Sequence, residues 1–283
     1  MGLFGKKKTV TTVDVKTTAT TTTTTTTTAA MPRTDLGRRP AAPAASLNLH
    51  DAPRQEGEKR IYNLIILDES GSMGSIYNQA LSGANETIDT IRIAQKENPE
   101  LVQTLTFVTF DSGAGRPDVR AVIDCQKIDA VKELTMDDYK PNGCTPLYDA
   151  MGISIRDLST IVKDGDNVLV TVITDGYENS SRIYNSSMVK EMVEGLRAKG
   201  WVFTYIGANQ DSVEVAGGLG IRNSMDFCQD ERGAQMMWDK LNSSRREYYK
   251  KASRMQSTGV MEDLESDFFS MKRGADRITP DHV

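Results

Sequence analysis

Histidine and cysteine are scarce in this chain of 283 residues. Only two histidines occur, His50 and His282, and we expect both to lie in disordered segments. A zinc site or a histidine-dependent catalytic triad therefore has almost no ligands or bases to use. The three cysteines, Cys125, Cys144 and Cys228, are odd in number, widely spaced and without a CxxC pair. This pattern indicates free thiols in a reducing compartment and not a disulfide framework.

Long apolar runs are also missing. No stretch approaches the ~18 apolar residues of a membrane-spanning helix, and the first residues have no apolar core of signal-peptide length. The formal net charge is −5 and no long basic stripe is present, which argues against a dedicated nucleic-acid binder. We therefore expect a cytoplasmic protein with no nucleic-acid partner and no integral membrane association.

Low-complexity sequence fills the beginning of the chain. Residues 9–28 are mostly threonine, and residues 29–58 are rich in Ala, Pro and Arg. Such segments bury too little apolar surface to offset the entropy of ordering them. We predict a disordered threonine-rich arm over residues 1–57. The arm acts either as a spacer or as a set of phosphate acceptors, and composition does not decide between the two.

The rest of the chain predicts one domain with one core over residues 58–229. A C-terminal helix is expected over 230–252, followed by a mobile tail over 253–283. The tail contains a short amphipathic piece, residues 260–269, with apolar side chains among acidic ones. This piece would either dock on a partner or fold back on the domain.

Apolar segments of strand length alternate with helical patterns through the domain. Strands are predicted at 61–67, 101–110, 119–125, 168–174, 201–206 and 224–228. Helices are predicted at 75–95, 146–162, 186–199 and 211–219. The link between the second and third strands is short enough for a hairpin, which makes the third strand an antiparallel edge strand. The fold class is therefore α/β, a doubly wound, mostly parallel central sheet with one antiparallel edge strand.

Oxygen-bearing side chains follow the strands where ligands bind in doubly wound folds, at the carboxyl ends. Asp68, Ser70 and Ser72 follow the first strand, Thr145 precedes a helix, and Asp175 ends the fourth strand. Hydroxyl and carboxylate oxygens are hard ligands that suit Mg²⁺ or Mn²⁺. The two serines, two residues apart in a turn, can point at one spot, while the two aspartates carry the negative charge. Since Mg²⁺ keeps several waters, the aspartates can act through water.

These segments resemble the metal-ion-dependent adhesion site of von Willebrand factor A-type (VWA) domains, and the order of strands and helices over 58–229 resembles that family too. The matching elements are Asp68-x-Ser70-x-Ser72, Thr145 within Gly-Cys-Thr-Pro-Leu, and Asp175 within Ile-Thr-Asp-Gly. The motif is intact at all five positions.

The resemblance implies a role for each position. Ser70, Ser72 and Thr145 would give hydroxyls directly to the metal, while Asp68 and Asp175 would act mostly through water. A protein partner would complete the coordination with an Asp or Glu carboxylate. The implied function is a metal-dependent protein-interaction module and not an enzyme. The sequence resembles soluble prokaryotic or phage members of the family that are associated with tellurite resistance and stress response. The partners of such members are kinase-like, phosphatase-like or AAA+ proteins.

Three alternatives stay open on the sequence. The Asp and Ser side chains of the first turn can simply cap a helix. A Mg²⁺-dependent phosphohydrolase is a second reading, although no Asp-x-Asp pair and no Gly-rich loop with a Lys follow the first strand. The third is a structural component of a larger assembly.

Several neighbouring residues are weaker candidates. We expect Glu69 to point away from the metal and shape the rim, Asp111 to serve a hairpin turn, and Glu178 to face solvent. Cys144 is expected to be a buried thiol beside Thr145. Tyr148 and Asp149 are expected to serve packing and surface.

Overall fold

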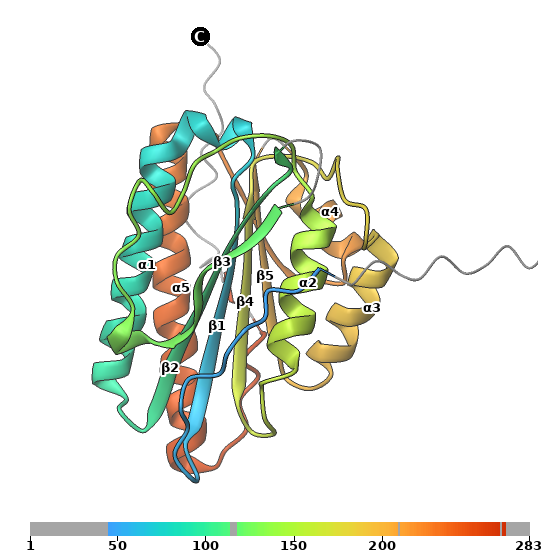
Figure 1. The fold of residues 1–283 in the computed structure, drawn as a ribbon. Coiled ribbons are helices and arrows are strands. Elements are labelled where there is room, and N and C mark those ends of the chain that lie inside the picture. Colours follow the sequence, from blue (N-terminus) through green and yellow to red (C-terminus); the bar gives the residue numbers. More distant parts are fainter. Residues whose placement is uncertain (1–44, 114–117, 209, 267, 270–283) are drawn as a thin grey trace, which may run out of the picture. The chain divides into compact units, whose positions relative to one another are not determined.

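The computed structural model describes residues 45–113, 118–208, 210–266 and 268–269. Within these residues six strands form one sheet in the order β3-β2-β1-β4-β5-β6 (Figure 1). The strands are β1 (Lys59–Asp68), β2 (Leu101–Asp111), β3 (Asp118–Lys127), β4 (Asn167–Thr174), β5 (Val202–Ala208) and β6 (Asn223–Phe227). Of the pairs in this sheet, only β2 with β3 is antiparallel. The predicted fold class is confirmed, including its antiparallel edge strand.

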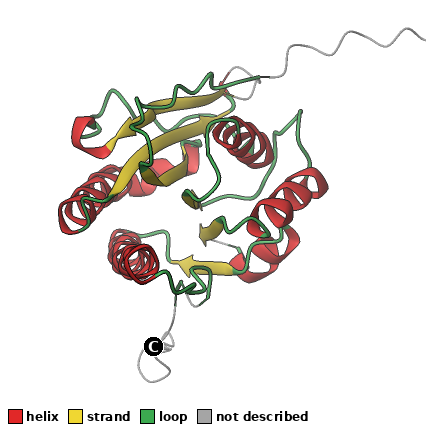
Figure 2. Ribbon diagram, turned by 90° about the horizontal axis from the view of Figure 1, so that it is seen from below, coloured by secondary structure: helices red, strands yellow, loops and turns green. Residues whose placement is uncertain are grey.

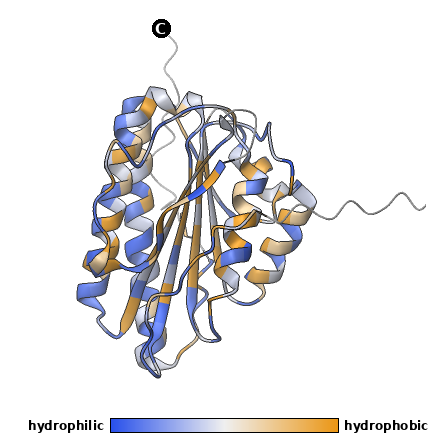
Figure 3. Cartoon of the chain, viewed as in Figure 1, coloured by the Kyte–Doolittle hydropathy of each residue, from blue (hydrophilic) through white to orange (hydrophobic). Residues whose placement is uncertain are grey.

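Helices cover both faces of the sheet (Figures 1 and 2). The long helices α1 (Tyr77–Glu97) and α5 (Glu231–Thr258) share one core with the sheet. The opposite face carries α2 (Leu147–Ser159), α3 (Ser186–Arg197) and α4 (Ser212–Gly218). Two short 3-10 helices, η1 (Gly71–Ile76) and η3 (Ile128–Ala130), complete the described elements. Figure 3 shows hydrophobic and hydrophilic segments alternating along the helices, as expected of elements with one face on a core.

The central strand β1 is buried on both faces, which explains its nearly continuous apolar sequence. Ile61 and Ile65 belong to the core under α1 and α5, whereas Leu64 and Ile66 belong to the opposite core. Both neighbours, β2 and β4, run parallel to β1. The carboxyl ends of these three strands therefore meet at one edge of the sheet, as the site prediction requires.

The last part of the N-terminal arm is ordered, in contrast to the prediction. We expected disorder through residue 57, but residues 45–57 lie against the domain. The backbone N–H of Leu47 donates to Asp157 at the end of α2 (2.6 Å), and Arg54 donates to Asp166 before β4 (2.7 Å). These contacts were not predictable from the low-complexity composition, because only a few polar groups make them. The threonine-rich residues 1–44 lie outside the described part of the chain.

His50 likewise belongs to this ordered segment, in contrast to the prediction. Its backbone N–H donates to Asp124 of β3 (2.9 Å), and its Nδ1 lies 2.7 Å from the same carboxylate. The other histidine, His282, lies outside the described residues.

The C-terminal helix is longer than the predicted 230–252. The Asp230 side chain accepts from the N–H of Gly233 and caps the start of α5 (2.6 Å), and Gly259 ends the helix in the left-handed region, with φ +68°. Beyond it Leu264 and Phe268 are buried in the core under α1 and α5. The start of the expected mobile tail is thus helix and then a segment folded back on the domain, while 270–283 lie outside the described residues.

Two further boundaries differ from the prediction by a few residues. The helix expected from residue 75 begins at Tyr77, because the chain first forms η1 and buries Met73 and Ile76 there. Pro146 precedes the first residue of α2 and does not occupy it. In the described part of the chain, no helix is long and apolar enough to span a membrane.

Candidate metal site

Asp68, the last residue of β1, is fully buried between two hydrogen-bond donors. One carboxylate oxygen accepts from the backbone N–H of Ser70 (2.7 Å), which forms an Asx-turn. The other accepts from the hydroxyl of Thr174 at the end of β4 (2.6 Å). Asp68 therefore ties the turn after β1 to the end of the adjacent strand.

Ser70, Ser72 and Asp175 form a continuous chain of oxygens. The hydroxyl oxygens of Ser70 and Ser72 lie 3.2 Å apart, and the Ser72 hydroxyl donates to Asp175 at 2.7 Å. Three side chains from two loops, separated by about one hundred residues, thus converge on one point. A turn that only capped a helix would not require the contact to Asp175. Moreover, neither serine caps η1 or α1 through its side chain.

Thr145 lies next to the loop that carries Asp175. A Cβ placed on Gly176, the residue after Asp175, would lie 3.2 Å from the Thr145 hydroxyl oxygen. Thr145 is held there by Asn179, whose side chain accepts from its N–H (2.8 Å) and whose own N–H donates to its carbonyl (3.1 Å). All five predicted residues therefore lie together at the carboxyl end of the sheet.

Glycine brings the two loops into contact. The N–H of Gly71 donates to the carbonyl of Gly143 (3.2 Å). Gly143 has φ +69°, and a Cβ there would lie 3.0 Å from the carbonyl carbon of Ser112. Since a side chain would be both strained and crowded, only glycine allows the loop before Thr145 to approach the serine turn.

The two carboxylates of the site are electrostatically costly in their charged form. Burial raises the pKa of Asp68 to about 7, although the hydrogen bonds from Thr174 and Ser70 oppose this. Burial also raises the pKa of Asp175, against the hydrogen bond from Ser72. A divalent cation would relieve this cost by stabilising both charges. Among the described residues no three His, Cys, Asp or Glu side chains gather as a metal cluster, so any ion here would depend on hydroxyl ligands.

Gln229 is a site residue that the sequence analysis missed. It lies between β6 and α5, and its side-chain N–H₂ donates to Asp175 and to the carbonyl of Ser72 (3.0 Å to the latter). It also donates to the Ser75 hydroxyl (3.0 Å). No local motif marks this glutamine. The only signal was its place after a parallel strand, at the same sheet edge as the other residues.

Replacing Gln229 with Ala should lower the free energy of unfolding by about 1 kcal/mol in the absence of metal, because it removes donors to the serine turn and to Asp175. Urea denaturation in the presence of a chelator measures this change. Gln235→Ala, at the outer side of α5, is the matched control and should leave stability within about 0.5 kcal/mol. Equal stability of the two variants would contradict a structural role of Gln229 in the site.

Three carboxylates around the site accept hydrogen bonds from neighbouring segments, and of these Glu69 and Asp149 are buried while Glu178 is partly buried. Glu69 accepts from Arg120 of β3 (3.0 Å) and from the backbone N–H of Lys140. Glu178, expected to face solvent, accepts from the N–H of Tyr148 at the start of α2 (2.9 Å). Asp149 has no exposed surface.

The loop after the site is held by Asp149, which was expected to serve packing and surface. Its carboxylate accepts from the backbone N–H groups of Arg182, Ile183 and Tyr184 (2.7–2.8 Å). Asp111 makes the turn contact expected of it, accepting from the N–H of Gly113 (3.1 Å). The loops that carry the five site residues are thus fixed by hydrogen bonds from outside the site.

Cys144 is exposed, in contrast to the prediction of a buried thiol. Its N–H donates to the Ser112 hydroxyl (3.2 Å), which leaves its side chain at the surface beside Thr145. Cys228 is also exposed, Cys125 is buried, and all three are free thiols, as expected.

No protein-family model matches the chain, and no curated protein matches it. Solved structures are similar in fold. The pilus adhesin SpaC from Lactobacillus rhamnosus GG has a TM-score of 0.50 at 12% identity, over 70% of this chain and 32% of its own. A von Willebrand factor type A protein from Catenulispora acidiphila has a TM-score of 0.45 at 15% identity, over 66% and 43%. Manganese-loaded TRAP from Plasmodium vivax has a TM-score of 0.45 at 15% identity, over 64% and 72%.

The sheet is doubly wound and mostly parallel with one antiparallel edge pair, as the sequence predicted, and the SpaC adhesin is similar to it in fold. At these identities the likeness shows the fold alone, and the chain spans less than half the length of SpaC and of the Catenulispora protein. What the five residues bind is therefore argued from their own geometry.

Proposed function

We propose that the chain binds a Mg²⁺ or Mn²⁺ ion through Ser70, Ser72, Thr145, Asp68 and Asp175, and uses it to bind a protein partner. The partner would supply an Asp or Glu carboxylate to a coordination position that the chain leaves open. The proposal is carried by one observation, the convergence of the Ser70, Ser72 and Asp175 oxygens from two separate loops.

The separations of these oxygens suit an octahedral ion. Neighbouring ligands of an octahedron with bonds of about 2.1 Å lie about 3.0 Å apart. The Ser70 and Ser72 hydroxyls are 3.2 Å apart, and Ser72 and Asp175 are 2.7 Å apart. Small movements of the side chains would bring the two hydroxyls into one coordination shell, with Asp175 close enough to act on the ion through a bound water. Carboxylate and hydroxyl oxygens are also the ligand types that these two ions prefer.

The charge of the site favours binding of an additional anion. Ser70, Ser72 and Thr145 would give neutral oxygens, while Asp68 is occupied by the Ser70 N–H and the Thr174 hydroxyl and would act through water. The bound ion would supply positive charge to an incoming carboxylate. Because few direct ligands would be anionic, that charge would remain largely uncompensated until a partner carboxylate arrives.

Titration of the full chain with Mn²⁺, followed by electron paramagnetic resonance of the free ion, tests the metal directly. The wild type should bind one ion. Ser72→Ala, which removes a proposed ligand, should weaken binding by at least about tenfold. Ser82→Ala, on the exposed side of α1, is the matched control and should bind as the wild type. Equal affinity of all three chains would contradict the proposed ligand set.

Partner capture tests the second half of the proposal. Wild-type chain should recover a partner in Mg²⁺ and lose it in chelator. The partners proposed on the sequence are kinase-like, phosphatase-like or AAA+ proteins of the cytoplasm. We also propose that the site binds and does not turn over a substrate. Metal-dependent hydrolysis of a phosphatase substrate panel by the pure chain would overturn that part.

A further inference from the structure

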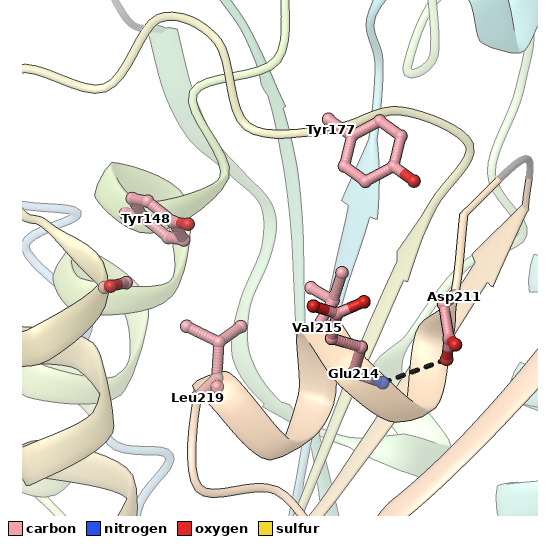
Figure 4. Close-up of a pocket in the computed structure, with 8 residues that line it drawn as sticks. Tyr148, Tyr177, Asp211, Glu214, Val215 and Leu219 are labelled. Atoms are coloured by element: carbon pink, nitrogen blue, oxygen red, sulfur yellow. Dashed lines mark hydrogen bonds between the residues drawn. The ribbon is translucent and has the colours of Figure 1, made fainter.

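A second hollow opens beside the candidate metal site, between the start of α2, the loop after β4 and helix α4 (Figure 4). Its volume is about 360 Å³, near the lower end of the range for ligand pockets, about 300–1,000 Å³. This size suits a single long side chain and not a large cofactor. Besides Gly218, the residues around it are Tyr148, Tyr177, Ser186, Asp211, Glu214, Val215 and Leu219.

The lining combines negative charge with aromatic and aliphatic surface. Asp211 and Glu214 lie at one side, and Tyr177 and Tyr148 at the others (Figure 4). No lysine or arginine lines the hollow. The ion pairs of the described residues include neither Asp211 nor Glu214. Neither acid is therefore paired with a lysine or arginine of the part of the chain that the structure describes.

The two acids are held differently. One Asp211 oxygen accepts from the N–H groups of Val213 and Glu214 at 3.0 Å each, which fixes the carboxylate at the start of α4. Glu214 is exposed on the first turn of α4 and free to reorient. Leu219, which is almost fully buried, and Val215, which is partly buried, supply the apolar wall.

We propose that this pocket binds an arginine side chain of the protein partner. The guanidinium would lie against Glu214 and Asp211, where it gains charge-assisted hydrogen bonds. The faces of Tyr148 and Tyr177 add a cation–π contribution. The aliphatic stem would lie along Val215 and Leu219, as long basic side chains do on apolar surface.

Two residues of the pocket are close in sequence to residues of the metal site. Tyr177 lies two residues after Asp175, so their Cα atoms are at most about 7 Å apart, and Tyr148 follows Thr145 by three residues. In the combined picture, which rests on the proposed function, the partner presents a carboxylate to the ion and an arginine to the pocket. Such a pair of opposite charges would fix the partner's orientation as well as its affinity. Binding of arginine to the pocket itself requires no metal.

Nuclear magnetic resonance of the full chain with ring-labelled tyrosines tests the pocket in the presence of a chelator. The probes are N-acetyl-arginine methylamide and its neutral counterpart N-acetyl-citrulline methylamide, neither of which has a carboxylate. Tyr148→Phe and Tyr177→Phe assign the two ring signals. The arginine probe should shift both signals in a saturable way, and the citrulline probe should not. Glu214→Gln should weaken arginine binding about threefold, the size expected for an exposed ion pair.

Glu97→Gln, on the opposite face of the sheet at the end of α1, is the matched control and should bind arginine as the wild type. Equal shifts from arginine and citrulline, no saturable shift from either, or unchanged binding by Glu214→Gln would overturn the proposal. Because chelator is present throughout, these outcomes do not depend on the ion. A pocket that binds arginine in a chain that fails to bind Mn²⁺ would therefore leave this inference standing and reject the proposed metal function.

Discussion

Replacing Asp68 with Asn should lower the affinity for Mn²⁺ by about 10–100-fold, the cost typical of losing a group that orients the metal's ligands. The variant should still fold. The asparagine oxygen can accept from the Ser70 N–H, and its N–H₂ can donate to the Thr174 hydroxyl, so both hydrogen bonds of Asp68 keep a partner. Loss of metal binding would thus come from the missing charge. Mn²⁺ titration and thermal unfolding of the same preparation measure the two effects.

Without metal the same variant should gain stability relative to the wild type as the pH rises. Burial raises the pKa of Asp68 to about 7 in the folded chain, whereas an unfolded aspartate has a pKa near about 3.9. Between these values the folded state holds a proton that the unfolded state has lost, so the wild type loses stability as the pH rises toward 7. The free energy of unfolding of Asp68→Asn minus that of the wild type, measured with chelator, should be at least about 1 kcal/mol greater at pH 8 than at pH 4.

A bound metal ion should oppose this loss of stability in the wild type. Saturation at about 100 times the dissociation constant stabilises a folded chain by about 2.7 kcal/mol. Mg²⁺ should therefore raise the stability of the wild type at pH 8, and at the same concentration should raise that of Asp68→Asn by only about 0.4–1.4 kcal/mol. Asp111→Asn, at the end of the neighbouring strand, is the control and should respond to Mg²⁺ as the wild type does. A wild type whose unfolding temperature is the same in Mg²⁺ and in chelator would contradict the proposed ion.

The five residues of the candidate site were predictable because their spacing and their place were both visible. Ser70 and Ser72 flank one glycine directly after a buried strand, and Asp175 directly follows another. Parallel strands of a doubly wound sheet must end at the same edge, so the pattern of strands brings the serine turn and Asp175 together, whereas Thr145 lies in the loop before α2 and follows no strand. The geometry agrees. The Ser72 hydroxyl lies within hydrogen-bond distance of both the Ser70 hydroxyl and the Asp175 carboxylate.

The groups that hold the site in place were not predictable in the same way. Asp149 accepts from three N–H groups more than thirty residues away, and Glu178 caps a helix thirty residues earlier. Such contacts depend on how loops cross in space, and no local period records them. A carboxylate in a polar stretch looks solvated until the backbone groups that it must satisfy are known. Gln229 was missed for the same reason.

The ends of the domain show where composition misleads. Residues 45–57 look like the rest of a low-complexity arm, yet Leu47 and Leu49 pack against the core and Asp51 pairs with the buried Arg60 (2.6 Å). At the other end Gly259 was a usable signal that the long helix continues beyond residue 252. Average composition predicts disorder at both ends. Single residues that pack on the core or cap a helix determine where the ordered chain begins and ends.

The contact between α1 and α5 supports a second large effect, on stability. Gly83 of α1 faces the fully buried Trp238 of α5, and a Cβ at position 83 would overlap the indole ring. One turn further along α1, the Thr87 hydroxyl donates to Asn242 of α5 (2.8 Å). The two helices are therefore also joined one turn beyond Gly83 and cannot separate there without straining the Thr87–Asn242 hydrogen bond.

Gly83→Ala should lower the free energy of unfolding by at least about 3 kcal/mol, the upper part of the range for overpacking a core. Gly195→Ala, in the interior of α3 where nothing lies near the new methyl group, should instead raise it by about 0.5–1 kcal/mol. Urea denaturation measures both. Because the cost arises between two side chains, Gly83→Ala combined with Trp238→Leu should be less destabilised than the sum of the single changes. Simple additivity would show that Gly83 is required for a reason other than the tryptophan.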